Sequence, residues 1–183
     1  MWPLLLLICY GSVAATPTPT APRHTKGVQI KNNGKDRLWI EMTNEDAFSL
    51  PPGQMASVIL EDTWSGRIFA RSEECQFKRC ETPYTTAELS FDGDGKEDTY
   101  KVSLADGYNV AMKIQPTGRS TFCRVASCRQ NLRRDCPASR QIKDDDGAVV
   151  GCAATSDGRR DVCPQADQAY SCKTSDTYVV SIG

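Results

Sequence analysis

The number and placement of the cysteines constrain this chain more than any other feature of its sequence. The chain has nine cysteines; Cys9 lies in an apolar segment that we interpret as a secretory leader, and all the others lie at or after Cys75. The remaining eight are an even number, which in a secreted domain predicts a framework of disulfides. We therefore expect crosslinks in the C-terminal part, whereas the residues before Cys75 must be held by pairing between strands.

The N-terminal segment predicts export. Residues 2–10 are almost entirely apolar and Val13–Ala15 has small side chains suited to cleavage, so we assign residues 1–15 to a signal peptide. The apolar run is too short to span a bilayer and no other segment is apolar enough, so we expect a secreted, extracellular protein without a membrane span. Residues 16–26 begin with alternating Thr and Pro and predict a disordered arm. Residues 27–183 fit one domain, which we expect to be a monomer.

Composition argues against several classes of function. The formal net charge is −1 and the basic residues are dispersed, so we expect no nucleic-acid partner. His24 is the only histidine and lies in the predicted arm, so we expect no catalytic group that needs histidine. A zinc site would need thiolates that the disulfides consume. The acidic segment at residues 92–98 does not fit a calcium loop, because its twelfth position is Ser103, so we expect no metal and no cofactor.

Short runs of β-branched and aromatic residues recur between turn residues. The predicted strands are Val28–Lys31, Arg37–Met42, Ala56–Leu60, Arg67–Arg71, Thr86–Phe91, Thr99–Leu104, Tyr108–Ile114 and Thr177–Ile182. Several of them alternate, which indicates strands with one buried face. Strands at this spacing predict an all-β, antiparallel sandwich. Residues 123–172 are polar and rich in cysteine, and predict loops pinned by disulfides, with room for one short helix at Arg124–Leu132.

Several separate motifs follow one another along the chain. They are Gly66–Arg71 with Cys75, Arg79–Thr82, Ala87–Leu89, Val102–Met112, Pro116–Gly118 with Cys123 and Cys128, Cys136–Ala138 with Cys152, and Cys163–Pro164 with Cys172. In this order they resemble the thaumatin family, over about residues 28–182. The resemblance implies a small member with an antiparallel thaumatin-like β-sandwich, a small disulfide-pinned loop region and a second domain that is largely deleted.

The resemblance also implies how the cysteines pair. Sequence alone leaves the pairing of eight cysteines open. Typical small members have one further pair, formed by the first and last cysteines of the family, which align here with Gly34 and Ile182. Both partners are missing together, so no unpaired thiol is left. The implied disulfides are Cys75–Cys80, Cys123–Cys172, Cys128–Cys163 and Cys136–Cys152.

The larger members of the family have an acidic cleft built from one Arg, one Glu and three Asp. Glu88 takes the Glu position and Asp106 one Asp position, whereas Lys101 replaces the middle Asp. The Arg belongs to a segment that is absent between Thr82 and Pro83, and the last Asp belongs to the deleted second domain. A glycosidase needs two carboxyl groups at the scissile bond, one of them protonated. A lysine between Glu88 and Asp106 would favour the charged form of both.

The cleft residues therefore favour binding over hydrolysis, although Glu88 and Asp106 can also be read as surface carboxylates or caps of a turn. Among the aromatic residues, Trp39 and Phe69 lie in strand patterns and we expect them in the core. Trp64 lies in a predicted turn and is expected to be exposed, and two tyrosines flank the implied cleft. The predicted binding cleft consists of Glu88, Lys101, Asp106, Tyr84, Tyr108 and Trp64, with no catalytic residue.

Three functions are compatible with this resemblance. The first, which we favour, is a secreted, non-catalytic, antifungal defence protein of the kind called pathogenesis-related group five, binding cell-wall β-1,3-glucan or another microbial surface polymer. The second is a weak endo-β-1,3-glucanase that uses Glu88 and Asp106. The third is a secreted effector or inhibitor that acts on a host protein. The reduced, mixed-charge cleft favours the first.

Overall fold

A computed structural model describes most of the predicted domain. The described residues are 25–76, 83–91, 97–118, 122–130, 135–154, 163, 165–173 and 175–183. The predicted signal peptide, most of the predicted arm, residues 92–96 of the acidic loop and Cys80 lie outside them, and so does the implied Cys75–Cys80 disulfide. Within the described ranges, no helix has the length and apolar character needed to cross a membrane.

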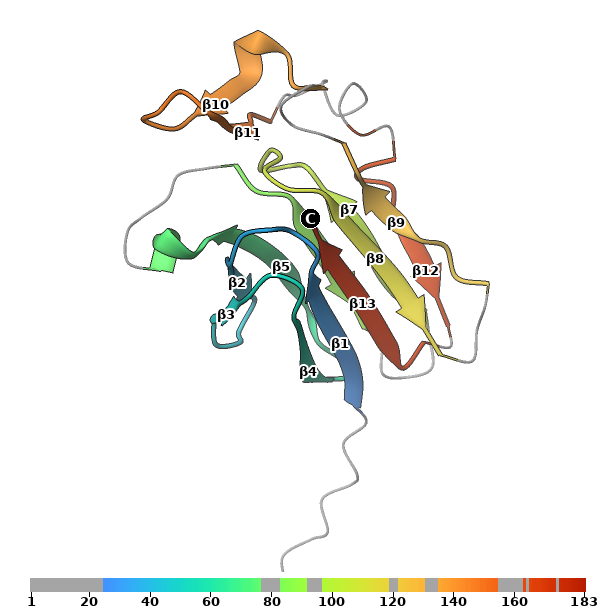
Figure 1. The fold of residues 1–183 in the computed structure, drawn as a ribbon. Helices are drawn as coiled ribbons and strands as arrows, with labels where there is room; N and C mark the ends of the chain where they lie inside the picture. Colours follow the sequence, from blue (N-terminus) through green and yellow to red (C-terminus); the bar gives the residue numbers. More distant parts are fainter. Residues whose placement is uncertain are drawn as a thin grey trace, which may run out of the picture.

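Two packed β-sheets form the body of the protein (Figure 1). One sheet has the order β4-β1-β13-β8-β9, the other has the order β12-β7-β6-β5-β2-β3, and β10 and β11 form a separate hairpin. The strands are β1 Thr25–Asn32, β2 Leu38–Met42, β3 Phe48–Leu50, β4 Met55–Glu61, β5 Ser65–Ser72, β6 Thr86–Ser90, β7 Asp98–Ser103, β8 Met112–Thr117, β9 Ala126–Cys128, β10 Gln141–Lys143, β11 Val149–Cys152, β12 Tyr170–Cys172 and β13 Thr177–Ile182. Two short 3₁₀ helices, η1 Glu73–Gln76 and η2 Ala138–Arg140, complete the described elements.

The predicted antiparallel β-sandwich is confirmed, with one exception and one error. Among the described strand pairs, only β1 and β13 run parallel, from the Gly27–Thr177 pair to the Asn32–Ile182 pair. The predicted helix at Arg124–Leu132 is wrong in its described part, because Ala126–Cys128 pairs with β8 as an edge strand. This segment is extended because Ala126 and Cys128 are both buried in the core, which requires the alternation of a strand.

Alternating apolar side chains fill the space between the two sheets. In β13, Tyr178, Val180 and Ile182 are each 0% exposed. The ring of Tyr178 packs against Phe91 at 5.3 Å and against Tyr100 at 5.7 Å between centroids. Because the core uses one face of each sheet, the intervening side chains of the six-stranded sheet point away from it and form an outer face.

A buried ion pair links the two sheets at one end of the sandwich. Asp98 is 1% exposed, and its Oδ2 lies 2.5 Å from Lys26 Nζ and accepts a hydrogen bond of 2.6 Å from the Tyr178 hydroxyl. Lys26 also donates to the Ser175 carbonyl at 3.0 Å. Burial, and then the neighbouring Asp98, raise the pKa of Tyr178. Thr25 and Lys26 also pair with Glu61 and Leu60 of β4, so the last two residues of the predicted disordered arm are part of β1.

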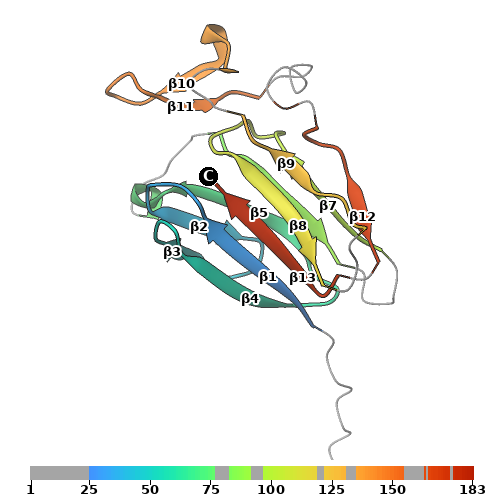
Figure 2. The same cartoon turned by 45° about the vertical axis from the view of Figure 1, so that its right-hand side comes forward.

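Three disulfides hold the cysteine-rich region, residues 123–172. They join Cys123 to Cys172, Cys128 to Cys163 and Cys136 to Cys152, with Cα–Cα distances of 5.5, 5.4 and 5.9 Å. These pairings match three of the four that the resemblance implies. The β10–β11 hairpin lies beyond the end of the sandwich (Figure 2), and a bridge between Tyr108 and Cys152 connects it to the body. A small loop region pinned by disulfides is therefore present.

Candidate functional site

Three charged side chains lie side by side on the outer face of the six-stranded sheet. Arg67 in β5 pairs with Glu88 in β6, and Glu88 pairs with Lys101 in β7. Their neighbours Ile68 and Ala87 point inward and are both 0% exposed. Strand alternation therefore places Arg67, Glu88 and Lys101 in one row that crosses three strands.

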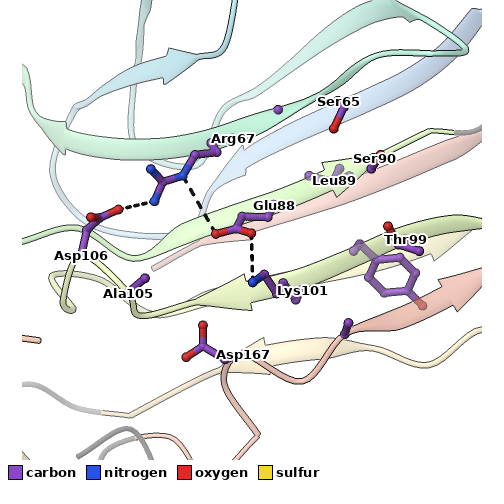
Figure 3. Close-up of a pocket in the computed structure, with 13 residues that line it drawn as sticks. Ser65, Arg67, Glu88, Leu89, Ser90, Thr99, Lys101, Ala105, Asp106 and Asp167 are labelled. Atoms are coloured by element: carbon purple, nitrogen blue, oxygen red, sulfur yellow. Dashed lines mark hydrogen bonds and ion pairs between the residues drawn. The ribbon is translucent and has the colours of Figure 1, made fainter. Parts of the chain in front are cut away.

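An ion-pair network connects this row to Asp106. The Arg67 guanidinium donates a hydrogen bond to Asp106 Oδ2, and its Nε lies 4.0 Å from Glu88 Oε1. The other oxygen of Glu88, Oε2, lies 3.1 Å from Lys101 Nζ. Figure 3 shows the guanidinium of Arg67 between the carboxylates of Glu88 and Asp106. Each of the two acids that the sequence singles out is therefore in contact with a cation.

A tight turn after β7 places Asp106 at the edge of this row. Gly107 closes the turn by donating its N–H to the Leu104 carbonyl at 2.9 Å. Its φ is +93°, and a Cβ there would lie 2.4 Å from Pro83 and 2.7 Å from the Cys152 carbonyl oxygen. Only glycine fits this backbone without strain, so Gly107 fixes the position of the preceding Asp106.

The row forms the floor of a pocket of about 630 Å³. Residues of β5, β6 and β7 line it, and the cysteine-rich region contributes Asp167 and Ala169. The N–H of Asp167 donates to the Val102 carbonyl at 2.7 Å, and its Oδ1 accepts a hydrogen bond of 2.9 Å from Ser103. Asp167 is thus a third carboxylate in the pocket, although the resemblance leaves the last Asp position of the family without a residue here.

The environment of Arg67 keeps its guanidinium charged. Burial on its own lowers the pKa of Arg67, but the hydrogen bond and the charge of Asp106 raise it, and Glu88 and Tyr84 act in the same direction. The net effect is a pKa above the ordinary value. The pocket therefore keeps a fixed positive charge between two carboxylates.

The structure brings together half of the predicted binding cleft. Glu88, Lys101 and Asp106 line the pocket, whereas Trp64, Tyr84 and Tyr108 do not. The expectation that Trp64 is exposed is wrong: it is half-buried, its Nε1 donates to the Thr43 carbonyl at 3.2 Å, and its ring packs 5.9 Å from Phe91.

Tyr108 is a structural residue in this fold. It is 2% exposed, and its hydroxyl donates to the Gln130 carbonyl. Burial, and then the charge of Asp135, raise the pKa of Tyr108 to about 12. A side chain so enclosed has no face left for a ligand, so its predicted place in the cleft is wrong.

Aromatic side chains gather beside the pocket, on the same outer face. Phe69 and Tyr84 stack with centroids 4.4 Å apart, and the Arg71 guanidinium lies 5.1 Å and 5.2 Å from these two rings. Trp39 pairs with Arg71 across β2 and β5. We call Trp39, Phe69, Arg71 and Tyr84 the aromatic cluster.

The expectation that Trp39 and Phe69 lie in the core is wrong. Both are half-buried, because the adjacent positions Ile40, Ile68 and Ala70 take the inward face of their strands. An alternating strand presents every second residue outward, and here two of those outward residues are aromatic. The sequence shows the alternation but not which face is buried.

The sequence is similar to one protein family and to several plant proteins. Residues 28–181 match the Thaumatin family. Pathogenesis-related protein 5 from Arabidopsis thaliana is 31% identical over 176 residues, which cover 75% of this chain and 73% of that protein. Thaumatin-like protein 1 from Pyrus pyrifolia is 29% identical over 154 residues, covering 66% and 63%. A Glucan endo-1,3-beta-glucosidase from Prunus avium is 27% identical over 175 residues, covering 80% and 71%. The chain thus spans only part of the length of these plant relatives.

Solved structures show the same fold at low sequence identity. The protein elicitor MoHrip2 from Magnaporthe oryzae has a TM-score of 0.53 at 12% identity, covering 86% of this chain and 98% of that one. The thaumatin-like xylanase inhibitor TLXI has a TM-score of 0.52 at 15% identity, covering 85% and 97%. The family match, the relatives and the shared sandwich all agree. The chain belongs to the thaumatin family.

Proposed function

We propose that this protein is a secreted, antifungal defence protein that binds β-1,3-glucan or another microbial surface polymer without cleaving it. The observation that carries the proposal is the position of Arg67 between the two candidate acids. A glycosidase holds the scissile bond between two carboxyl groups, one of which supplies a proton. Here the guanidinium lies between Glu88 and Asp106, and Lys101 engages the remaining oxygen of Glu88.

The same network suits the binding of sugar hydroxyls. Hydroxyl groups both donate and accept hydrogen bonds, and the pocket offers carboxylates as acceptors and two cations as donors. Hydrogen bonds to charged groups are about twice as strong as those between neutral groups. The three disulfides support secretion, because such bonds persist in oxidising compartments.

Retention on insoluble β-1,3-glucan, together with release of reducing sugar from soluble glucan, tests this proposal. We expect the oxidised protein to be retained and to release no reducing sugar. Glu88→Gln and Asp106→Asn should each weaken retention by about tenfold, because each removes a charged acceptor. Asp145→Asn is the matched control, because Asp145 is an exposed carboxylate in the turn between β10 and β11. Loss of retention in this control, or no retention of the unmodified protein, would contradict β-1,3-glucan as the ligand of this pocket.

A weak endo-β-1,3-glucanase is the second candidate. It is favoured by the similarity to the Prunus avium glucosidase and by the presence of Glu88 and Asp106 in one pocket. The same assay separates the two functions. Release of reducing sugar that Glu88→Gln abolishes would establish the enzyme and overturn the non-catalytic proposal.

A further inference from the structure

We propose that the aromatic cluster is a second subsite, so that one neutral polysaccharide chain lies across the outer face from the charged pocket to Trp39. This inference rests on the proposed function and extends it to a surface outside the pocket. It assigns a binding role to Trp39 and Phe69, which are expected in the core from the sequence, together with Tyr84 and Arg71.

The pocket and the aromatic cluster are continuous. Arg67, Phe69 and Arg71 are alternate residues of β5, so all three point to the outer face, and the first of them lines the pocket. The N–H of Tyr84 donates to the Asp106 carbonyl at 3.3 Å, so the segment before β6 is attached to the turn that carries the pocket carboxylate. A ligand leaving the pocket along β5 therefore meets the aromatic cluster next.

Three members of the aromatic cluster, Phe69, Arg71 and Tyr84, hold one another in place before any ligand arrives. Arg71 Nε lies 3.1 Å from Glu41 Oε1, and its guanidinium packs over both stacked rings. Its side chain is only 18% exposed. Binding to an ordered surface loses less conformational freedom than binding to a mobile one. The rings are therefore a preorganised apolar surface beside a polar pocket.

The charges of the face point to a neutral ligand. In the pocket, Arg67 and Lys101 are paired with Glu88 and Asp106. In the aromatic cluster, Arg71 is paired with Glu41. A strongly charged partner would have to break these pairs, whereas hydroxyl groups can add hydrogen bonds to them. Sugar rings also have apolar C–H faces, which suit flat aromatic surfaces.

The size of the face sets the length of the ligand. Lys101 and Trp39 are three strands apart and offset by four residues along β5, a diagonal of about 20 Å from ordinary strand spacings. A disaccharide in the pocket cannot reach across this distance, whereas a hexasaccharide is long enough to contact both parts. The two parts can therefore be distinguished by ligand length.

The test is calorimetric titration of the oxidised, full-length secreted protein with a β-1,3-linked glucose disaccharide and hexasaccharide. Trp39→Ala removes the ring, and Trp39→Leu keeps apolar bulk in case the alanine variant folds poorly, which thermal unfolding would reveal. The matched control is Ile59→Ala, because Ile59 is 67% exposed on β4 of the other sheet. Glu88→Gln reports on the pocket.

We expect both Trp39 variants to weaken hexasaccharide binding by about tenfold and to change disaccharide binding by less than about twofold. Glu88→Gln should weaken binding of both ligands, and Ile59→Ala neither. If both Trp39 variants bind the hexasaccharide as the unmodified protein does, the second subsite is wrong and the proposed function stands. An equal loss for both ligands would also overturn it. If the unmodified protein binds neither ligand nor insoluble glucan, the proposed binding of β-1,3-glucan itself fails.

Discussion

The sandwich and the cysteine-rich region are held together by different interactions. The sandwich strands β1, β4 and β5 are seven or eight residues long, and a continuous apolar core lies between the sheets. In the cysteine-rich region the strands β9 to β12 have only three or four residues. Strands this short bury little surface and form few ladder hydrogen bonds. In the cysteine-rich region, disulfides therefore supply the stability that these short strands cannot.

The largest effect is expected at the buried ion pair of the sandwich. Asp98→Ala leaves the Lys26 ammonium without its carboxylate in a nearly buried position, and should lower the free energy of unfolding by about 3–5 kcal/mol. Urea denaturation measures this loss. The double variant Lys26→Met with Asp98→Leu should lose less, because it leaves no unpaired charge. An equal loss in both variants would show that packing, not charge, holds this end.

Removing disulfides one at a time tests the cysteine-rich region. The Cys123–Cys172 bond closes a separation of 49 residues and the Cys136–Cys152 bond one of 16. Loop entropy predicts losses of about 4 and about 3 kcal/mol when each pair is replaced by serine. Hydrogen exchange should show that loss of Cys136–Cys152 opens the β10–β11 hairpin and leaves β1 and β13 protected. Exchange spreading to β13 would mean that the two regions unfold as one unit.

Alkaline pH should weaken the sandwich and its junction with the hairpin. Burial raises the pKa of Tyr100 and Tyr108 to about 12. The folded state then holds protons that the unfolded state releases above about pH 10, so stability is full below that pH and falls between about pH 10 and about pH 12. Urea denaturation at several pH values measures how steeply the free energy of unfolding falls with pH. Tyr108→Phe should make this fall less steep. If the fall is unchanged, groups other than Tyr108 cause the loss of stability at alkaline pH.

The smallest effect is expected at an exposed ion pair that is part of neither the apolar core nor the disulfide-linked region. Arg37 Nε lies 3.5 Å from Glu73 Oε2, and these side chains are 47% and 40% exposed. Arg37→Gln should change the free energy of unfolding by less than about 1 kcal/mol. If Arg37→Gln lowers the free energy of unfolding as much as removal of a disulfide does, this exposed ion pair stabilises the sandwich far more than its exposure predicts.

Sequence reasoning found the long strands but not their partners. Thr177–Ile182 alternates clearly and matches β13 residue for residue. Its parallel pairing with β1 depends on contacts between segments about as far apart as the chain allows, which no local pattern encodes. The strand β9 was missed because three residues are too few to show a period. Whether so short a segment forms a strand depends on its neighbours in the fold, and β9 forms because it pairs with β8.

In the candidate site too, the sequence indicates residues within local motifs but not those brought in by long-range contacts. Glu88, Lys101 and Asp106 followed from family motifs, and all three line one pocket. Arg67 was missed because its place opposite Glu88 follows from the register between β5 and β6. Asp167 was missed because it comes from the cysteine-rich region and reaches the pocket through its bond with Val102. Trp64 was misplaced because a turn position does not exclude packing against Phe91.

The central place of β13 has a consequence for biogenesis. It lies between β1 and β8, so five strands become one sheet only when residues 177–182 are available. Until then, β1 and β8 each have one edge whose backbone groups lack a partner strand, and such edges favour association between chains. This sheet therefore cannot close before β13 is synthesised, and we expect chains that stop before residue 177 to aggregate rather than to form a smaller sandwich.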